Sequence, residues 1–279
     1  MATTDASPRT SAGVEVSTNS SSSRYRPRFD RRSTGVAAGR LGIIAAFLAL
    51  WQLSSGRWVE EYLISSPTLV VERLVQLIRA GTIQDDFVVT GVEFVLGYTI
   101  GVSLGLLAGV LLGAWPILGK LLEPLISALN GIPKIALAPL IILWLGIGME
   151  SKVGIAVMTV FFVMFYNTYI GMRTVPAPLV NALRVMGADK LTIVRKVVLP
   201  QMSMAILSGL RSGIPFAAIG VIVGEFVAST HGLGYYIRTS SDAYDAAGIF
   251  AGVALLMVLM MAMSLIVTIW ERRVTRWQR

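Results

Sequence analysis

The 279-residue chain is 54% hydrophobic and only 14% charged, and its mean hydropathy is +0.70. This composition excludes a water-soluble globular protein and a wholly disordered chain, because both classes need more polar surface. The absence of cysteine excludes disulfide frameworks and thiolate metal sites, and the net charge of +8 is informative only once its location along the chain is known.

The first 34 residues are polar. Ser and Thr are frequent, large aliphatic side chains are almost absent, and five arginines lie between Arg24 and Arg32. Such a segment buries too little apolar surface to offset the entropy of ordering. We predict a disordered basic tail over residues 1–34 and a transmembrane domain over residues 35–279.

Six apolar runs follow the tail, and each is close to the ~20 residues that a helix needs to cross ~30 Å of hydrocarbon. The runs are continuously apolar rather than alternating, which favours helices over barrel strands. The sequence therefore predicts an all-α membrane protein with six transmembrane helices, and an amphipathic helix outside the core over Glu60–Asp86. The predicted spans cover residues 35–55, 87–114, 121–147, 153–172, 203–228 and 248–270.

The positive residues are distributed unequally between the two sides of the predicted bundle. With the N-terminus inside, 17 of the 24 Lys and Arg residues fall on the inner side, 5 on the outer side and 2 within spans. Cytoplasmic segments carry the excess of Lys and Arg. We therefore expect a multi-pass protein with both termini in the cytoplasm.

Glycine recurs at every fourth position of the second run, which places five glycines on one helical stripe that a second backbone can approach closely. A dimer seam and a contact within the chain are both open, and we favour the contact within the chain. The glycines are Gly97, Gly101, Gly105, Gly109 and Gly113.

The third run contains a break. Pro133 follows Gly131 and Ile132, and proline removes a backbone donor and clashes with the preceding turn. Lys134 beside the break suits a watery cavity, since irregular backbone is tolerated at membrane depth only inside protein or against water. A kink used only for packing, with Lys134 reaching to an interface, is an equal alternative.

Ionisable residues also lie in or beside the apolar runs. Such groups are costly in lipid and usually face a bundle interior, a partner charge or a water-filled path. Glu225 is the main candidate and Glu93 a weaker one, although Glu93 and Arg211 can also be interfacial. The residues assigned to a translocation path are Lys134, Arg211 and Glu225.

Residues 173–202, between the fourth and fifth spans, are too polar for lipid and too patterned for a passive loop. Two short amphipathic helices are predicted to meet at Gly187, where glycine allows a sharp change of direction, and to be closed by Pro200. We call residues 173–202 the elbow. It suits insertion into a groove of another protein, and an amphipathic hairpin on anionic lipid is the alternative.

The elbow resembles the signature loop of the permease subunits of binding-protein-dependent ABC importers, which reads Glu-Ala-Ala, three residues, Gly, and then Leu-Pro. Two positions depart from it, since Asn181 replaces the glutamate and Leu183 the second alanine. The resemblance runs from about Ser66 to the last span and is closest to the sulfonate, taurine and nitrate subgroup, through stretches such as Gly232-Leu233-Gly234-Tyr235. The positions in register are Ala182, Gly187, Ala188, Leu199 and Pro200.

The resemblance implies a type I importer core in a bacterial plasma (inner) membrane. The implied partners are a dimer of cytoplasmic ATPases, an extracytoplasmic solute-binding protein, and a second permease copy in a homodimer, with no nucleic acid. The chain has no Gly-x-x-x-x-Gly-Lys-Ser/Thr, so we expect no catalytic residues, metal or cofactor here and ATP-Mg on the ATPase. The residues assigned to ATPase coupling are Asn181, Ala182, Leu183, Gly187, Ala188, Asp189, Leu199 and Pro200.

The expected cargo is a small solute. Because Lys134 and Arg211 are cationic, we favour an anion, such as a sulfonate, nitrate, or an aromatic or carboxylic acid. A secondary transporter or a membrane scaffold without an ATPase is the alternative. A secondary transporter usually shows internal repeats with paired broken helices, and only one break is evident in this sequence.

Overall fold

The computed structural model describes residues 31–274, and every named element in that range is helical. The chain falls into two units, Met1–Phe47 and Leu48–Arg279. Helix α1 (Arg31–Ser54) begins within the first unit. The last four residues of the predicted tail therefore lie in a helix, whereas the prediction for residues 1–30 lies outside the described residues.

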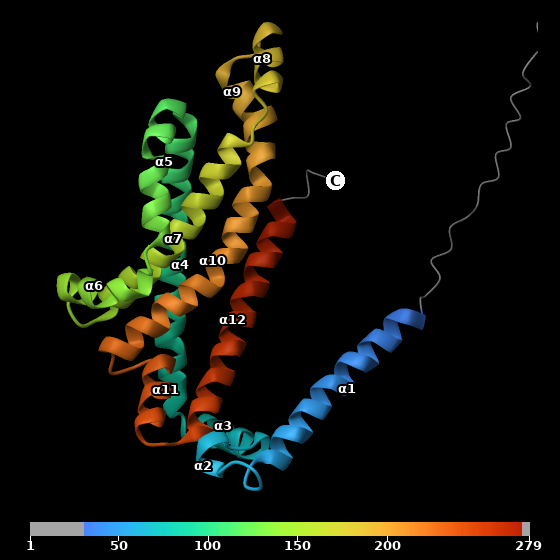
Figure 1. Cartoon of the computed structure of the whole chain (residues 1–279), viewed down its shortest axis with the longest axis vertical. Helices are drawn as coiled ribbons and strands as arrows, with labels where there is room; N and C mark the ends of the chain where they lie inside the picture. The colour runs from blue at the N-terminus through green and yellow to red at the C-terminus, as the bar shows by residue number, and fades with distance from the viewer. Residues whose placement is uncertain (1–30, 275–279) are drawn as a thin grey trace, which may run out of the picture. The chain divides into compact units, whose positions relative to one another are not determined.

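The second unit carries the rest of the fold. Figure 1 shows α8 and α9 at one end of this unit and α11 with α2 and α3 at the other. Its elements are α2 (Glu61–Ile64), α3 (Pro67–Ala80), α4 (Thr82–Ala114), α5 (Pro116–Gly131), η1 (Lys134–Leu137), α6 (Ala138–Leu145), α7 (Met149–Arg173), α8 (Ala177–Val185), α9 (Lys190–Ile193), η2 (Val194–Val198), α10 (Leu199–Ala228), α11 (Leu233–Asp242) and α12 (Ala246–Val274).

Four of the described helices are long and apolar enough to cross a membrane, and they correspond to the second, fourth, fifth and sixth predicted spans. The first and third runs contain shorter apolar helices, Gly39–Ser54 and Lys134–Leu145. The prediction of an all-helical membrane protein is confirmed. The four long helices are Thr82–Ala114, Met149–Arg173, Lys190–Ala228 and Ala246–Ile269.

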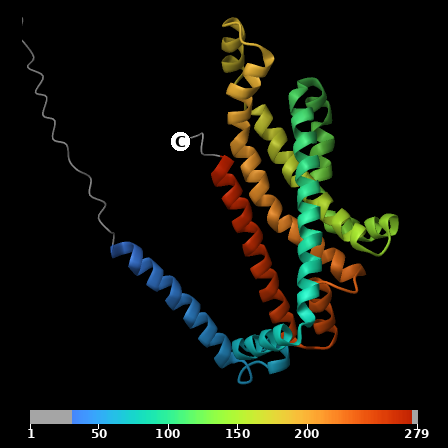
Figure 2. The same cartoon turned by 180° about the vertical axis from the view of Figure 1, so that it is seen from behind.

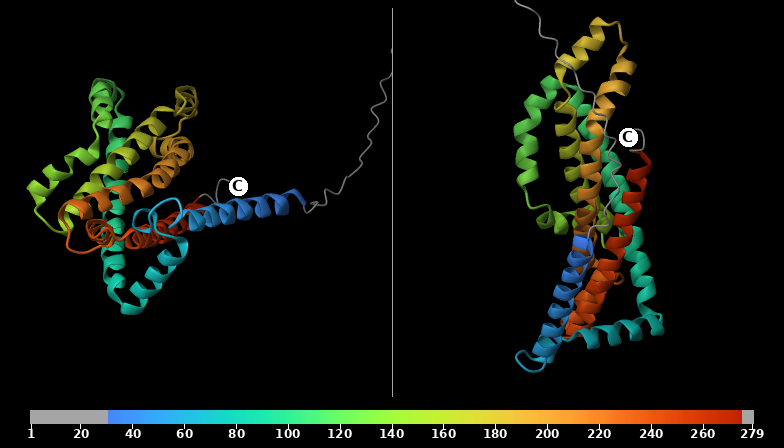
Figure 3. Two further views of the ribbon diagram at one scale, coloured as in Figure 1. Left: turned by 60° about the horizontal axis from the view of Figure 1, so that its bottom comes forward. Right: turned by 90° about the vertical axis from the view of Figure 1, so that its right-hand side faces the viewer.

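The third run is broken at the predicted place. Helix α5 ends at Gly131, and the backbone is extended at Ile132 and Pro133 before η1 begins. Proline forces this geometry because it disfavours a helical residue before it and donates no hydrogen bond. Helix α6 then runs across the direction of α5 (Figure 3).

The glycine stripe of α4 packs against α7 of the same chain, so the contact within the chain is confirmed. A Cβ built on Gly101 would lie 2.8 Å from Val160 Cβ, and one on Gly109 would lie 2.6 Å from Thr168 Cβ. The facing α7 residues also recur at every fourth position, so a ridge of α7 side chains fits the groove that the glycines leave on α4. They are Ala156, Val160, Met164, Thr168 and Met172.

Helix α10 packs on another side of α7, as the view from behind also shows (Figure 2). A Cβ on Gly220 of α10 would lie 2.6 Å from Ala156 Cα. Ala156 and Val160 of α7 and Ala217 of α10 are wholly buried in the resulting core. Helix α7 is therefore the central element, held between α4 and α10 at backbone-to-backbone distance.

Two local predictions were wrong. Pro200 does not close the elbow, because α9, η2 and α10 run on as one helical segment from Lys190 to Ala228. The π-type turn η2 ends at Val198, two residues before Pro200, and such a widened turn accommodates a residue that donates no backbone hydrogen bond. The region Glu60–Asp86 is not one helix either, since the chain turns at Ser65, with φ +52°, and at Gly81, with φ +70°.

We expect Gly105→Ala to destabilise the protein. The new Cβ would lie 2.7 Å from the carbonyl oxygen of Phe161 and 3.0 Å from the backbone nitrogen of Phe165, and backbone atoms cannot rotate away. Overpacking of this kind costs about 1–3 kcal/mol. The measurement is unfolding of the purified protein in mild detergent.

Gly91→Ala is the matched control on the same helix, because the nearest atom to its Cβ is Leu259 Cδ1 at 3.8 Å. It should be neutral or slightly stabilising. Equal stability of the two variants would contradict the close approach of α4 and α7.

Candidate functional site

The elbow turns at Gly187, as predicted. Gly187 has φ +80°, its N–H donates to the carbonyl of Arg184 at 3.0 Å, and the Ala188 N–H donates to the carbonyl of Leu183 at 2.9 Å. This pair of bonds is the Schellman ending of a helix, which requires a left-handed residue at the position of Gly187. The change of direction after α8 is therefore built from the backbone.

Asp189 begins the next helix. Its carboxylate accepts a hydrogen bond from the Thr192 backbone N–H at 3.2 Å, which makes it the N-cap of α9. The Thr192 side chain and, next to it in effect, the Thr192 backbone N–H stabilise the charged form and so lower the pKa of the Asp189 carboxyl below its ordinary value. The cap fixes where α9 starts relative to the turn at Gly187.

Apolar side chains are exposed at the tip of the elbow. Val185 is 90% exposed and Met186 80% exposed, and Leu191 on α9 is exposed as well. Among the described residues nothing covers them, and an exposed apolar cluster of this kind marks an interaction surface. The predicted coupling residues from Asn181 to Asp189 gather here, whereas Leu199 and Pro200 lie at the start of α10.

The three residues predicted for a translocation path differ in their surroundings. The Lys134 ammonium lies 5.1 Å from the ring centroid of Phe162 on α7, and Arg211 is exposed on α10. Glu225, in contrast, is wholly buried within the second unit. Glu225 therefore differs from the two cations, because its side chain is enclosed by other helices of the same chain.

Glu225 joins α10 to α4 and α11. Its Oε1 accepts a hydrogen bond from the Thr90 hydroxyl at 2.7 Å, and its Oε2 accepts one from the Gly234 N–H at 2.5 Å. The Thr90 hydroxyl oxygen in turn accepts from the Leu233 N–H at 2.8 Å. One carboxylate and one hydroxyl therefore hold the N-terminal end of α11 against two membrane-spanning helices.

A second buried charge, Glu93, lies three residues after Thr90 on α4. It forms an ion pair with Lys152 of α7, and both side chains are almost completely buried. The Lys152 ammonium also donates to the Ser229 hydroxyl at 3.1 Å, just after the end of α10. The pair ties the same ends of three helices together.

Two glycines make room for this network. Gly232 has φ +113°, which disfavours a side chain, and its N–H donates to Asp86 of α4 at 2.6 Å. A Cβ on Gly234 would lie 2.7 Å from Glu225 Oε2 and 2.9 Å from Glu225 Cβ. Positions 232 and 234 therefore require glycine, because the backbone at Gly232 and Gly234 closely approaches the carboxylate of Glu225.

Glu225 and Glu93 were predicted from the sequence, but the residues that bind them were not. Thr90 and Ser229 resemble ordinary hydroxyl residues at helix ends, and Lys152 is one of the five positive residues that the charge count assigned to the outer side. The available signal was Lys152 itself, because a lysine at the start of an apolar run commonly has a partner. Helix α11 was not predicted, since its ten residues lack an apolar stretch.

The chain has relatives of known type. Residues 101–278 match the family described as binding-protein-dependent transport system inner membrane component. The putative aliphatic sulfonates transport permease protein SsuC of Bacillus subtilis (strain 168) is 30% identical over 268 residues, which cover 96% of each chain. The taurine transport system permease protein TauC of Escherichia coli (strain K12) is 24% identical, over 85% of this chain and 88% of that protein.

Another relative has a different named solute. The riboflavin transport system permease protein RibX of Chloroflexus aurantiacus is 31% identical, over 78% of this chain and 81% of that protein. Among solved structures, the MetNI methionine ABC transporter in an inward-facing conformation matches with a TM-score of 0.54 at 22% identity, over 70% of this chain and 94% of that chain. The structural likeness shows a shared fold.

We expect Thr90→Val to weaken the attachment of α11. The substitution keeps the side-chain shape but leaves the Leu233 N–H and one oxygen of Glu225 without their partner, which costs about 1–3 kcal/mol. Thr99→Val, at an exposed position of the same helix, is the control and should change stability little. The readout is unfolding together with thiol labelling of an introduced Leu233→Cys, which is unique because the chain has no cysteine. Equal protection in both backgrounds would contradict the assignment.

We expect Lys152→Met to cost about 3–5 kcal/mol, because it leaves the Glu93 carboxylate buried without its counter-charge. Adding Glu93→Gln should restore much of the loss, since the double variant buries no net charge. The measurement is a double-mutant cycle on unfolding in detergent. Additive losses would show that the two residues act independently. Lys190→Met, at an exposed position, controls for loss of a lysine alone.

Proposed function

The chain belongs to the family of binding-protein-dependent transport system inner membrane components, and from this premise we propose that it forms the translocation path of an ATP-driven importer for a small organic anion. That it is a permease subunit of an ABC importer and a multi-pass membrane protein follows from the family match and the four apolar spans. The observation that carries the finer proposal is the elbow, whose exposed apolar tip lies at one end of the bundle.

The elbow is the proposed contact with a cytoplasmic ATPase. Val185 and Met186 would enter a groove of the ATPase, and the Schellman turn at Gly187 holds them forward. Leu183 and Asn181 replace the alanine and glutamate of the family pattern, so the contact would depend more on apolar burial than on charge. ATP and Mg²⁺ would bind the partner, because this chain has no P-loop.

The segment from Lys190 to Ala228 is the proposed lever between the two ends of the molecule. It is 39 residues long, which at 1.5 Å per residue corresponds to a rod of ~60 Å. Glu225 near its far end holds α11 through the Gly234 N–H. A displacement of the elbow would therefore also move α11. Movement of α11 would open or close the translocation path at the end opposite the elbow.

The proposed orientation places the elbow in the cytoplasm and α11 on the extracytoplasmic side, where a solute-binding protein would deliver the cargo. The asymmetry of Lys and Arg supports this orientation. A second copy of the chain would complete the path. Lys134 and Arg211 would favour an anionic solute, and the sulfonate group of the solutes named for two relatives supports that class, whereas the riboflavin named for a third does not.

The test of the importer proposal is affinity purification of the tagged chain from mild detergent with identification of what co-purifies. Recovery of a P-loop ATPase, followed by ATP-dependent uptake of a radiolabelled sulfonate in proteoliposomes, is the expected result. Stable recovery with no ATPase would overturn the proposal and favour a secondary transporter or a scaffold.

Gly187→Pro should abolish coupling without unfolding the membrane bundle. Proline is restricted to φ near −65°, which the +80° of Gly187 does not allow, and it removes the N–H that donates to Arg184. The measurement is solute-stimulated ATPase activity of the reassembled complex. Gly131→Ala is the control, because a Cβ there meets nothing within 4 Å. Unaltered coupling in the Gly187 variant would count against the elbow.

A further inference from the structure

Helix α3 lies at the end of the bundle opposite the elbow and runs across the direction of α4 and α12 (Figure 3). Both of its ends are fixed locally. The Ser66 hydroxyl accepts the Leu69 N–H at 3.4 Å at the start, and Gly81, with φ +70°, turns the chain into α4. The Arg73 guanidinium donates to the Asp245 carboxylate at 2.6 Å, which holds α3 against the start of α12.

Helix α3 carries two apolar stripes side by side. The stripe that packs into the core comprises Val70, Leu74 and Leu77. Each residue of a helix is rotated by about 100° from the one before it, so the next residue after each of these forms a second stripe. This outer stripe is exposed, and it comprises Val71 (58% exposed), Val75 (41%) and Ile78 (54%). The polar face, one step further round, comprises Glu72, Gln76 and Arg79. The apolar arc of α3 is therefore wider than the core covers.

Two exposed aromatic side chains precede the outer stripe. Trp58, in the turn after α1, is 78% exposed, and Tyr62 on α2 is 56% exposed. Each ring has an apolar body and one polar atom, and such rings are enriched at the level of the lipid head groups. The Trp51 indole N–H donates to the Ile64 carbonyl at 3.1 Å, which attaches α2 to the end of α1. Aromatic and apolar side chains together on an amphipathic segment are typical of a membrane interface.

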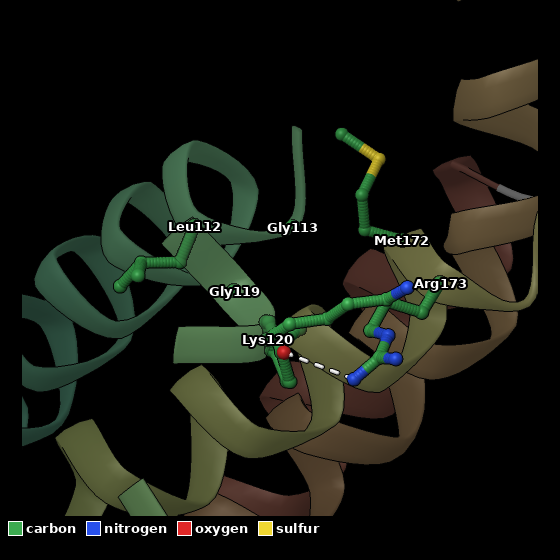
Figure 4. Close-up of a pocket in the computed structure, with 7 residues that line it drawn as sticks. Leu112, Gly113, Gly119, Lys120, Met172 and Arg173 are labelled. Carbon is green, nitrogen blue, oxygen red and sulfur yellow. Dashed lines mark hydrogen bonds between the residues drawn. The ribbon is translucent and has the colours of Figure 1, made fainter. Parts of the chain in front are cut away.

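The length of α4 places α3 at the level of the head groups. The 33 residues of α4, at 1.5 Å each, make a helix of ~50 Å, which with a modest tilt matches the ~40–45 Å of a bilayer with its head groups. Beside its far end lie Trp115 and the cavity lined by Lys120 and Arg173 (Figure 4), residue types that concentrate at membrane interfaces. The beginning of α4, where Gly81 joins it to α3, therefore lies at the opposite interface.

Exposed apolar side chains also flank α2 and α3 along the chain. Leu50 and Leu53, near the end of α1, are 56% and 52% exposed, and Val88 and Val92 of α4 are 60% and 43% exposed. They belong to an apolar helix and to a membrane-spanning helix. The outer stripe therefore lies between two segments whose exposed apolar faces a bilayer covers. This continuity favours lipid as its cover over a second copy of the chain or another protein.

We propose that α2 and α3 lie in the bilayer interface at the end of the bundle opposite the elbow, with the outer stripe on the acyl chains and with Trp58 and Tyr62 among the head groups. The partner is a phospholipid surface. No particular head group is selected, because the polar face of α3 carries charges of both signs. Through the ion pair of Arg73 with Asp245, this contact sets the depth at which α12 enters the membrane. The proposal depends on neither the solute nor the ATPase.

The experiment measures the surroundings of single nitroxide labels on the full-length chain in vesicles of phosphatidylcholine and phosphatidylglycerol. The chain has no cysteine, so Val75→Cys and Ile78→Cys each accept one label, and Gln76→Cys on the polar face is the matched control. All three positions are exposed, so the substitutions should leave the fold intact. Collision rates are measured with oxygen, which concentrates in lipid, and with a water-soluble nickel chelate. The ratio of oxygen to nickel collisions should be several-fold higher at positions 75 and 78 than at position 76.

Two outcomes would overturn the proposal. Free access of the nickel chelate at all three positions, with equal ratios, would place the outer stripe in water. Low collision rates with both reagents at positions 75 and 78 would mean that protein covers the stripe, as in a contact with a second copy or another subunit. Val75→Cys and Ile78→Cys test the stripe separately, so failure of one variant to insert into vesicles leaves the other to decide.

Discussion

The close approach of α4 to α7 is the constraint on which the rest of the structure depends. Without side chains on the glycine stripe, the two backbones meet at distances that leave no space for a Cβ, and this packing sets the register of α7 against α4. In a bilayer, where apolar side chains gain little by leaving lipid, such packing is a principal source of association between helices. Helix α10 packs on another side of α7, and the buried network around Glu225 and Glu93 depends on the register of these three helices.

Much of this architecture was predictable because its cause is local in the sequence. The glycine stripe, the break at Pro133 and the turn at Gly187 each follow from a residue whose backbone properties allow few alternatives. The long runs were recognisable as helices for the same reason. The continuation of the helix through Pro200 was not predictable, because a single wide turn absorbs the missing donor and composition does not reveal such a turn.

The partners in the polar network were less accessible to sequence reasoning. Glu225 was identified as a buried charge, but its bonds run to Thr90 and to the backbone of Gly234, and the first of these is separated from it by more than a hundred residues. Only tertiary packing brings them together. The same holds for Lys152 and Glu93, whose pairing depends on the register that the glycines impose between α4 and α7.

The wide turn at Val194–Val198 also changes which way the long helical segment faces. An α-helix advances by about 100° for each residue, so one residue inserted into a turn rotates everything beyond it by that angle. The face that α9 presents at the elbow is therefore not in line with the face that α10 buries against α7. One continuous helical segment can then present one face at the elbow and a different face to α7. A change in the winding of this single turn would rotate α9 about the helix axis relative to α10, instead of shifting it along the axis.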